Sequence, residues 1–310
     1  MDECIAATHS AGLHTQSASG PLRPFFFRLA QLAKIAAVFI FVFDGPNRPP
    51  VKRGKIVQSQ INLWWADDAK NLIESFGFYV HEAPGEAEAE LALLNRWGMI
   101  DALWTSDSDG LVFGGIAVLR TIPSKERETG RLDEIKLYTA ENVKRTIGFD
   151  CSQLILFALV TGGDYSSGIP GGGKLAACEI VRSPIGETFR RLLSGWDGNE
   201  ADLDAWRQST LDTLNAGKSI SRLTSRSENA LRKNIHSFPS PDALRYYANP
   251  ATSLTHPAYL PNSWSLVQQP NIPRLVDICM QRLGWSRDPK KLLTIFRNNV
   301  WEGVIVRMVL

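Results

Sequence analysis

The chain has 310 residues, 44% of them hydrophobic, which allows one large domain or two ordinary ones. Its 34 Lys and Arg against 32 Asp and Glu leave a net charge of only +2, so a nucleic-acid surface would need local clustering of basic residues. Four widely separated cysteines without a CxxC pair argue against a disulfide framework and a zinc site, and fit a reducing, intracellular compartment. There is no uninterrupted apolar run of about 18 residues and no recognisable signal peptide, so neither a membrane span nor export is expected.

Helical and strand patterns alternate over the first 140 residues. A helical pattern over 24–37 leads into the apolar block AVFIFVF, which is typical of a buried strand and ends at Asp44. Four more elements follow: a helix within 62–77, a strand within 78–84, and a helix and a strand within 85–107. AVLRTI and LDEIKLYT then predict a hairpin with the charged stretch SKERETG as a mobile tip. The expected fold is an α/β domain whose parallel-rich sheet is flanked by helices.

Helical patterns take over after the hairpin. CSQLILFALVTGGDY is a strongly apolar helix, GIPGGG interrupts it, and KLAACEIV begins another, which is a helix-hairpin-helix pattern over about 153–183. Residues 184–310 are predicted to be a helical C-terminal region with proline-rich breaks. A solvated helical cap that completes the core is favoured there over a second active site.

Six carboxylates stand where an α/β sheet would place its functional edge. Asp44 ends a strand, Glu86 and Glu88 open a helix, and Asp107 and Asp109 follow the strand ALWTS. The sixth, Asp164, ends the apolar helix at GGD. All six could converge outside the carboxyl ends of the strands, where α/β proteins bind ligands.

Carboxylates brought so close together would repel one another unless cations were present, and hard divalent ions such as Mg²⁺ prefer oxygen ligands. Each pair also has an ordinary explanation, because acids favour helix starts and DSD is a common turn sequence. The flanking residues are apolar at Asp44, Asp107 and Asp164, which indicates that core elements hold these acids. That context favours a metal site.

Several motifs resemble those of the XPG-like structure-specific DNA endonucleases. FVFDGPNRPPVKRGK is similar to the end of their N-terminal nuclease region, and HEAPGEAEAELALL, TSDSDGLVFG and ALVTGGDYSSGIPGGGKLAA are similar to their internal region. The resemblance implies a PIN-like nuclease core over 1–183. Within it, residues 1–55 would form a partial N-terminal region and residues 75–183 the internal region with its helix-hairpin-helix.

The resemblance also implies a chemistry. It assigns metal binding and catalysis to the six carboxylates and implies two Mg²⁺ ions, with Mn²⁺ as a substitute, roughly 4 Å apart. One ion would activate water and the other would stabilise the leaving oxygen of a phosphodiester, leaving 5′-phosphate and 3′-hydroxyl ends. The implied substrate is branched or flapped duplex DNA in repair or recombination, which implies a nuclear protein.

The start of the chain departs from the family pattern. Family members begin with an MGI-type motif and a strand that carries the first catalytic Asp, whereas this chain begins MDECIAA. Asp2 stands at about the right distance before Asp44 to be that first metal-binding acid. We expect either a shortened N-terminus, a start assigned too late, or a relative that has lost catalysis.

Two glycine- or lysine-containing segments are candidates for DNA binding. Glycines of the GIPGGG turn let backbone N–H groups and the next helix N-terminus approach a phosphate, which the family does with help from a monovalent cation such as K⁺. The residues concerned are Gly168, Gly171, Gly173 and Lys174. In PPVKRGK, the cations Lys52, Arg53 and Lys55 could hold the scissile phosphate, or could be a solvated basic turn. Trp64 and Trp65 are expected to be core residues and not base-stacking ones.

Three functional hypotheses follow. The first is an active endonuclease on flaps or junctions, and the second is a DNA-binding pseudonuclease that keeps the hairpin but lacks a competent metal site. A PIN-type ribonuclease is the third, but it leaves the GGDY–GIPGGG hairpin unexplained. Little sequence separates KRGK from ESFG and no sliding-clamp peptide is visible, which favours the fungal resolvase-like branch and leaves open a dimer on junction DNA.

Overall fold

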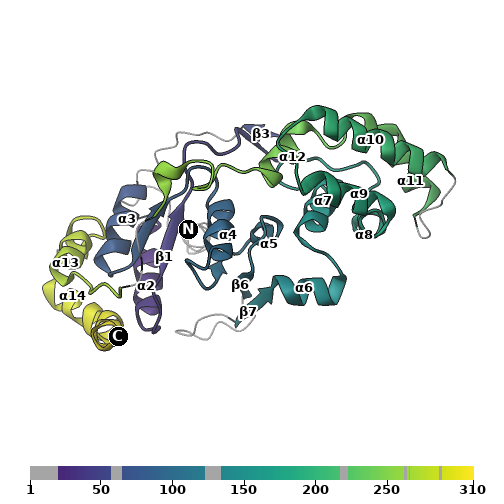
Figure 1. The fold of residues 1–310 in the computed structure, drawn as a ribbon. Helices are drawn as coiled ribbons and strands as arrows, with labels where there is room; N and C mark the ends of the chain where they lie inside the picture. The colour runs from purple at the N-terminus through teal and green to yellow at the C-terminus, as the bar shows by residue number, and fades with distance from the viewer. Residues whose placement is uncertain are drawn as a thin grey trace. The chain divides into compact units, whose positions relative to one another are not determined.

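The computed structural model describes residues 20–56, 65–122, 134–216, 223–261, 264, 266–285 and 288–310. The chain forms two compact units (Figure 1). Unit 1 comprises Met1–Phe43, Gln60–Glu82 and Pro261–Leu310, and unit 2 comprises Asp44–Ser59 and Ala83–Leu260. The C-terminal region expected to begin after residue 183 is therefore divided between the two units, and its independence as a domain stays a prediction.

Unit 1 is built on a short parallel pair of strands covered by helices. Its elements are α2 (Leu22–Ala33), β1 (Ile40–Phe43), α3 (Ala66–Ser75), β4 (Tyr79–Glu82), α13 (Ile272–Gln281), α14 (Pro289–Ile295), the π-helical turn η4 (Phe296–Val300) and α15 (Trp301–Val309). β1 and β4 run parallel, with Ile40 opposite Tyr79. The predicted order helix, strand, helix, strand is confirmed here.

Aromatic residues fill the core of unit 1. Phe26 of α2 is fully buried, and its ring centroid lies 5.2 Å from that of Phe76 and 5.1 Å from that of Trp285. Trp65 is also buried, as expected of a core residue, and Trp64 lies outside the described residues. The buried Arg307 joins the C-terminal helix α15 to this unit, because its guanidinium donates to backbone carbonyls of Ala37, Gly77 and Gln268.

The strands of unit 2 form two small sheets. β2 (Val51–Lys52) and β3 (Lys55–Ile56) pair antiparallel, and β5 (Leu103–Trp104), β6 (Ala117–Ile122) and β7 (Glu134–Thr139) form a sheet in that order. β5 and β6 are parallel, whereas β6 and β7 are antiparallel. The predicted hairpin is therefore confirmed, while its tip SKERETG lies outside the described residues.

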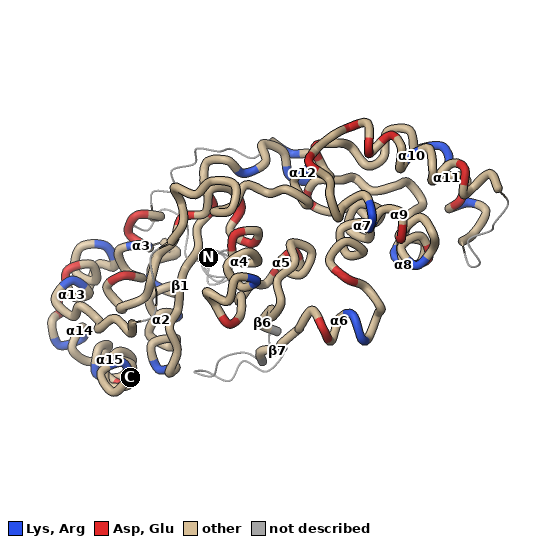
Figure 2. Tube along the Cα trace, viewed as in Figure 1, with Lys and Arg blue, Asp and Glu red and all other residues tan. Residues whose placement is uncertain are grey.

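Helices make up most of unit 2. They are α4 (Ala87–Arg96), α5 (Asp109–Val112), α6 (Ala140–Ile147), α7 (Cys151–Thr161), α8 (Lys174–Arg182), α9 (Pro184–Leu193), α10 (Glu200–Asn215), α11 (Ser225–Asn234), α12 (Pro241–Ala248) and the 3₁₀ turns η1 (Ile235–Ser237) and η2 (Pro257–Tyr259). Figure 1 shows α7 to α11 gathered together, and a single hydrophobic core joins them to α12. Figure 2 shows basic and acidic residues mixed along α10 and α11, as expected of solvated faces.

The helix-hairpin-helix is formed by α7 and α8. Asp150 and Gln153 make a reciprocal capping box that starts α7, and Leu156 and Leu159 of this helix are fully buried. Gly162 ends the helix with φ 87°, a conformation that only glycine adopts readily. The mixed α/β fold with small sheets agrees with the expected fold class.

Candidate metal centre

Asp44 and Glu86 meet at the start of α4. Asp44 directly follows β1, and its Oδ1 accepts a hydrogen bond from the backbone N–H of Ala87 at 2.9 Å. Glu86 occupies the N-cap position of α4 but makes no capping bond with its own side chain. Because Asp44 satisfies this N–H at the helix start, the Glu86 carboxylate is left to point elsewhere.

Asp107 and Asp109 are held by the turn that follows β5. The Thr105 hydroxyl accepts the backbone N–H of Asp107 at 3.0 Å, and the Asp107 carboxylate accepts the N–H of Ser108 at 2.6 Å. Asp109 is the first residue of the short helix α5. Both acids therefore have backbone positions defined by local hydrogen bonds.

Asp164 follows the end of α7 and is buried, with 6% of its surface exposed. One oxygen each from Asp107, Asp109 and Asp164 lie within 4.8 Å of one another. Asp164 is far from Asp107 and Asp109 in the sequence and follows a different helix, yet the three carboxylates lie at one place. Three oxygen donors at this spacing match the ligand chemistry of a hard divalent cation.

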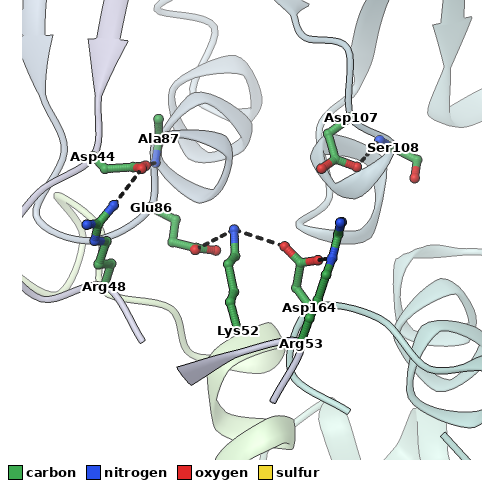
Figure 3. A network of polar contacts seen from close by, with 9 residues as sticks. All are labelled: Asp44, Arg48, Lys52, Arg53, Glu86, Ala87, Asp107, Ser108 and Asp164. Carbon is green, nitrogen blue, oxygen red and sulfur yellow. Dashed lines mark hydrogen bonds and ion pairs between the residues drawn. The ribbon is translucent and has the colours of Figure 1, made fainter. Parts of the chain in front are cut away.

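Lys52 joins this triad to Glu86. Its Nζ lies 2.8 Å from Glu86 Oε1 and 2.9 Å from Asp164 Oδ2, so one ammonium bridges two carboxylates (Figure 3). The next residue, Arg53, places its Nε 2.7 Å from Asp164 Oδ1, and its backbone N–H donates to the Asp164 carbonyl at 2.6 Å. The β2–β3 hairpin is therefore attached to the acid cluster by charge as well as by backbone.

Burial and mutual repulsion shift the pKa values of these acids. Burial raises the pKa of Glu86 to about 7, against the lowering effect of Lys52. Burial, with Asp107 and Asp164 nearby, raises the pKa of Asp109 to about 6, and burial also raises the pKa of Glu88. Burial alone would raise the pKa of Asp164 too, but Lys52 and Arg53 outweigh it and hold this pKa below its usual range.

The six predicted carboxylates are therefore brought into one electrostatic neighbourhood in unit 2. Asp44 is the most exposed member that the structure describes, and Arg48 lies 3.3 Å from its Oδ2. Burial first, and neighbouring carboxylates second, raise the pKa of Glu86 and Asp109 toward neutral pH, and cations would stabilise such a site. The residues present fit a divalent metal; Asp2 lies outside the described residues, and the individual roles stay predictions.

The predicted DNA-contacting residues lie on two hairpins. A Cβ on Gly168, which has φ 74°, would stand 2.7 Å from the backbone nitrogen of Gly162, so only glycine fits there. Gly171 also has positive φ, and Gly173 is the N-cap of α8, directly before the exposed Lys174. Lys55 is exposed on β3.

Sequence reasoning missed one residue that contacts the cluster and one that packs directly beside it. Arg48 pairs with Asp44, and Tyr247 of α12 packs against Tyr165, with ring centroids 4.8 Å apart. The spacing of Asp44 and Arg48 is visible in the sequence, but an Arg four residues after an acid is too common to indicate a site. Nothing in the segment PDALRYYA indicated that its second Tyr lies beside Asp164, because the contact depends on how α12 packs.

A family model described as XPG I-region matches residues 77–164, which hold five of the six carboxylates. The chain carries an XPG I-region and is related to the XPG-family nucleases. "Flap endonuclease GEN-like 1" of Arabidopsis thaliana is 32% identical over 186 residues, covering 52% of this chain and 30% of that protein. This chain spans less than a third of the length of the GEN-type flap endonucleases that it matches.

Solved structures give the same relationship. One described as "eukaryotic junction-resolving enzyme GEN-1 binding with Cesium" has a TM-score of 0.68 and 27% identity, covering 95% of this chain and 68% of the other. Another, the Holliday junction-resolving enzyme GEN1 in complex with product DNA, Mg²⁺ and Mn²⁺ ions, has a TM-score of 0.59 and 27% identity, covering 86% and 59%. None of the described helices is both long and apolar enough to cross a membrane.

Proposed function

We propose that this chain is a metal-dependent endonuclease that hydrolyses phosphodiester bonds in branched DNA, in repair or recombination. The observation that carries the proposal is the triad of Asp107, Asp109 and Asp164 oxygens within 4.8 Å of one another in a chain with an XPG I-region. Junction-resolving and flap-cleaving relatives support a DNA substrate. A nuclear location would follow from that substrate.

The acid cluster would hold two Mg²⁺ ions, or Mn²⁺ in their place, through Asp44, Glu86, Glu88, Asp107, Asp109 and Asp164, with Asp2 as a further candidate. When bound, such ions supply Lewis-acid activation of water and stabilisation of the leaving oxygen. The carboxylates of this chain fix where that chemistry occurs, because α4, α5 and the end of α7 each hold one side of the cluster. Their raised pKa values mean that some must lose protons before ions bind.

Lys52 and Arg53 would hold the scissile phosphate beside the metal ions. Without DNA their cationic groups contact Glu86 and Asp164, so the positive charges already stand at the acid cluster. A phosphate oxygen is an equivalent partner for both groups. Exchange of carboxylate for phosphate would let the same side chains position the substrate.

The α7–α8 hairpin would grip the duplex away from the cut. Gly168, whose N–H donates to the Ser166 hydroxyl at 3.1 Å, would shape the turn, and the exposed Gly171 and Gly173 would let a phosphate approach the backbone. Lys174 would add a charge, and Lys55 would extend the contact from β3. A monovalent cation such as K⁺ at this hairpin, as in the family, is part of the proposal. The hairpin would read phosphates and not bases, so affinity should fall steeply with salt.

The test is cleavage of labelled flaps, bubbles and four-way junctions by the chain with Mg²⁺. Asp109→Asn should abolish cleavage and leave DNA binding intact, whereas the exposed Glu141→Gln on α6 should change neither. Binding without cleavage of any substrate by the chain as given would instead support a pseudonuclease. Neither binding nor cleavage would overturn the proposal.

Binding through the hairpin is tested separately. Lys174→Glu together with Gly171→Asp should weaken binding to all duplex-containing substrates by a similar factor and reduce the salt dependence. Lys144→Glu, the same charge change at an exposed position of α6, is the matched control. Unchanged affinity in the folded double variant would remove the hairpin from the proposal.

A further inference from the structure

A third glutamate of α4, Glu90, lies one helical turn after Glu86 and is fully buried. A buried carboxylate needs hydrogen-bond donors in place of water, because an unpaired buried charge is costly. Ser253 supplies two such donors: its backbone N–H lies 2.8 Å from Glu90 Oε2, and its hydroxyl donates to Oε1. Ser253 is itself only 1% exposed, so solvent does not compete for these bonds.

The segment that carries Ser253 also packs on the loop before α4. Gly85, in that loop, has no side chain, and a Cβ there would stand 2.7 Å from the carbonyl oxygen and 3.0 Å from the Cβ of Ala251. A side chain at position 85 would therefore push the two backbones apart. The segment Ala251–Ser253 thus contacts the chain at positions 85 and 90.

The first turn of α4, between these two contacts, carries two of the metal-site acids. Glu86 is the N-cap and Glu88 follows within the turn. The backbone N–H of Glu90 donates to the Glu86 carbonyl at 3.1 Å, so the residue with the buried carboxylate is bonded directly to the N-cap. At the start of the turn, Asp44 accepts the N–H of Ala87 at 2.9 Å. Restraint at both ends leaves the two acids few alternative positions.

These contacts come from a part of the chain that the sequence predicted to be only a cap. Ser253 lies beyond the residues 77–164 that the XPG I-region model matches, in the stretch after α12. Local hydrogen bonds shape this stretch: the buried Thr252 donates its N–H to the Thr255 hydroxyl at 3.0 Å, and its carbonyl accepts the N–H of His256 at 2.8 Å. A segment with a defined shape can restrain the helix that it contacts.

We propose that Ser253 is a positioning residue for the metal centre, which holds the first turn of α4 through the Glu90 carboxylate and so keeps Glu86 and Glu88 at the acid cluster. Ser253 touches no reacting atom. The inference rests on the proposed function for its catalytic meaning. The bonds between Ser253 and Glu90 do not depend on that function.

The matched variants are Ser253→Ala and Ser183→Ala. Both remove the hydroxyl of a buried serine of unit 2 and leave the charge unchanged; the Ser183 hydroxyl caps α9 by accepting the N–H of Ile185 at 3.2 Å. Both should therefore lower the melting temperature. Only Ser253→Ala should weaken Mn²⁺ binding by the DNA-free chain, by about tenfold, as loss of a contact that orients metal ligands does.

Ser253→Ala should also speed hydrogen exchange of the Ala87 and Glu90 amides, whose bonds belong to the first turn of α4. It should raise the metal concentration for half-maximal cleavage and leave DNA affinity unchanged. Ser183→Ala should alter neither the exchange of these two amides nor that metal concentration.

A second pair of variants tests the contact from the side of α4. Gly85→Ala should weaken Mn²⁺ binding as Ser253→Ala does, because the new Cβ must displace the backbone of Ala251. Gly195→Ala, where the Cβ meets open space, is the control. In the Ser253→Ala background Gly85→Ala should cost less than it does alone, since the segment is already released. Independent, additive losses in this double-mutant cycle would contradict the proposal.

The readouts separate positioning from stability. Equal Mn²⁺ affinity and equal Glu90 amide exchange in Ser253→Ala and the wild-type chain would overturn the proposal, as would equal losses of Mn²⁺ affinity in Ser253→Ala and Ser183→Ala. If Ser253→Ala does not fold, the comparison of Gly85→Ala with Gly195→Ala decides. If the wild-type chain binds no Mn²⁺, the proposed function fails, and amide exchange at Glu90 then still decides whether Ser253 holds this turn.

Discussion

Loading of the acid cluster with Mg²⁺ or Mn²⁺ should release protons, because metal ligands must be ionised and two of these carboxylates are partly protonated near neutral pH. The pKa of Glu86 is raised to about 7 and that of Asp109 to about 6. At pH ~6.5 these values leave about 0.8 proton on Glu86 and about 0.2 on Asp109, or ~1 released on loading. At pH ~8 the total falls to about 0.1.

Calorimetric titration of the DNA-free chain with Mn²⁺, in buffers of different ionisation enthalpy, measures the number of protons released on metal binding. Glu86→Gln should remove most of the release at pH ~6.5, and Asp109→Asn a smaller part. Glu141→Gln, at an exposed position, should leave it unchanged. Equal proton release at both pH values, or release that survives Glu86→Gln, would refute the reasoning.

The same shift predicts how stability depends on pH without metal. The folded-state pKa of Glu86, about 7, lies above the ordinary value of 4.5, so the folded chain binds more protons between these values. The stabilisation of the fold by the protonated Glu86 is thus fully present below pH 4.5 and is lost as pH rises through about 7. At 1.36 kcal/mol per unit the upper bound is about 3 kcal/mol. With EDTA the melting temperature should fall between pH ~5 and ~8, and Mg²⁺ should restore it most at the higher pH.

Three further substitutions follow from single contacts. Lys52→Met should raise Mn²⁺ affinity at pH ~8 by about tenfold, because its ammonium no longer competes for the Asp164 carboxylate. Ser253→Ala should cost about 1–3 kcal/mol in urea unfolding, because the fully buried Glu90 loses a hydroxyl donor. Arg307→Met should cost about 2–5 kcal/mol, since this fully buried guanidinium donates to three backbone carbonyls of unit 1.

The Lys52 and Arg307 substitutions each have a matched control. Lys55→Met, on the exposed strand β3, should leave Mn²⁺ affinity unchanged, and Arg297→Met, at an exposed position of η4, should leave stability nearly unchanged. Equal Mn²⁺ affinity in Lys52→Met and Lys55→Met would show that the ammonium does not compete with the ion. Loss of less than about 0.5 kcal/mol in Ser253→Ala or Arg307→Met would contradict the assigned contacts.

The helices and strands of this chain could be predicted from its sequence because local residue patterns determine them. An apolar run opened by Asp150 and closed by Gly162 specifies α7, and the pattern of AVLRTI and LDEIKLYT specifies an antiparallel hairpin. The acids after strands and at helix starts could likewise be found, because they follow apolar blocks directly. Local propensity and hydrophobic periodicity act within a few residues, so a linear reading captures them.

The tertiary structure alone decided which charges meet. Lys52 bridges Glu86 and Asp164, and Tyr247 packs on Tyr165 directly after Asp164, although nothing in the neighbouring sequence specifies these contacts. The sequence predicted Lys52 and Arg53 beside a phosphate, or as a solvated turn, and not paired with the carboxylates. The direction of a side chain at the end of an element depends on how helices from distant parts of the chain pack, and burial then sets the pKa values that the site adopts.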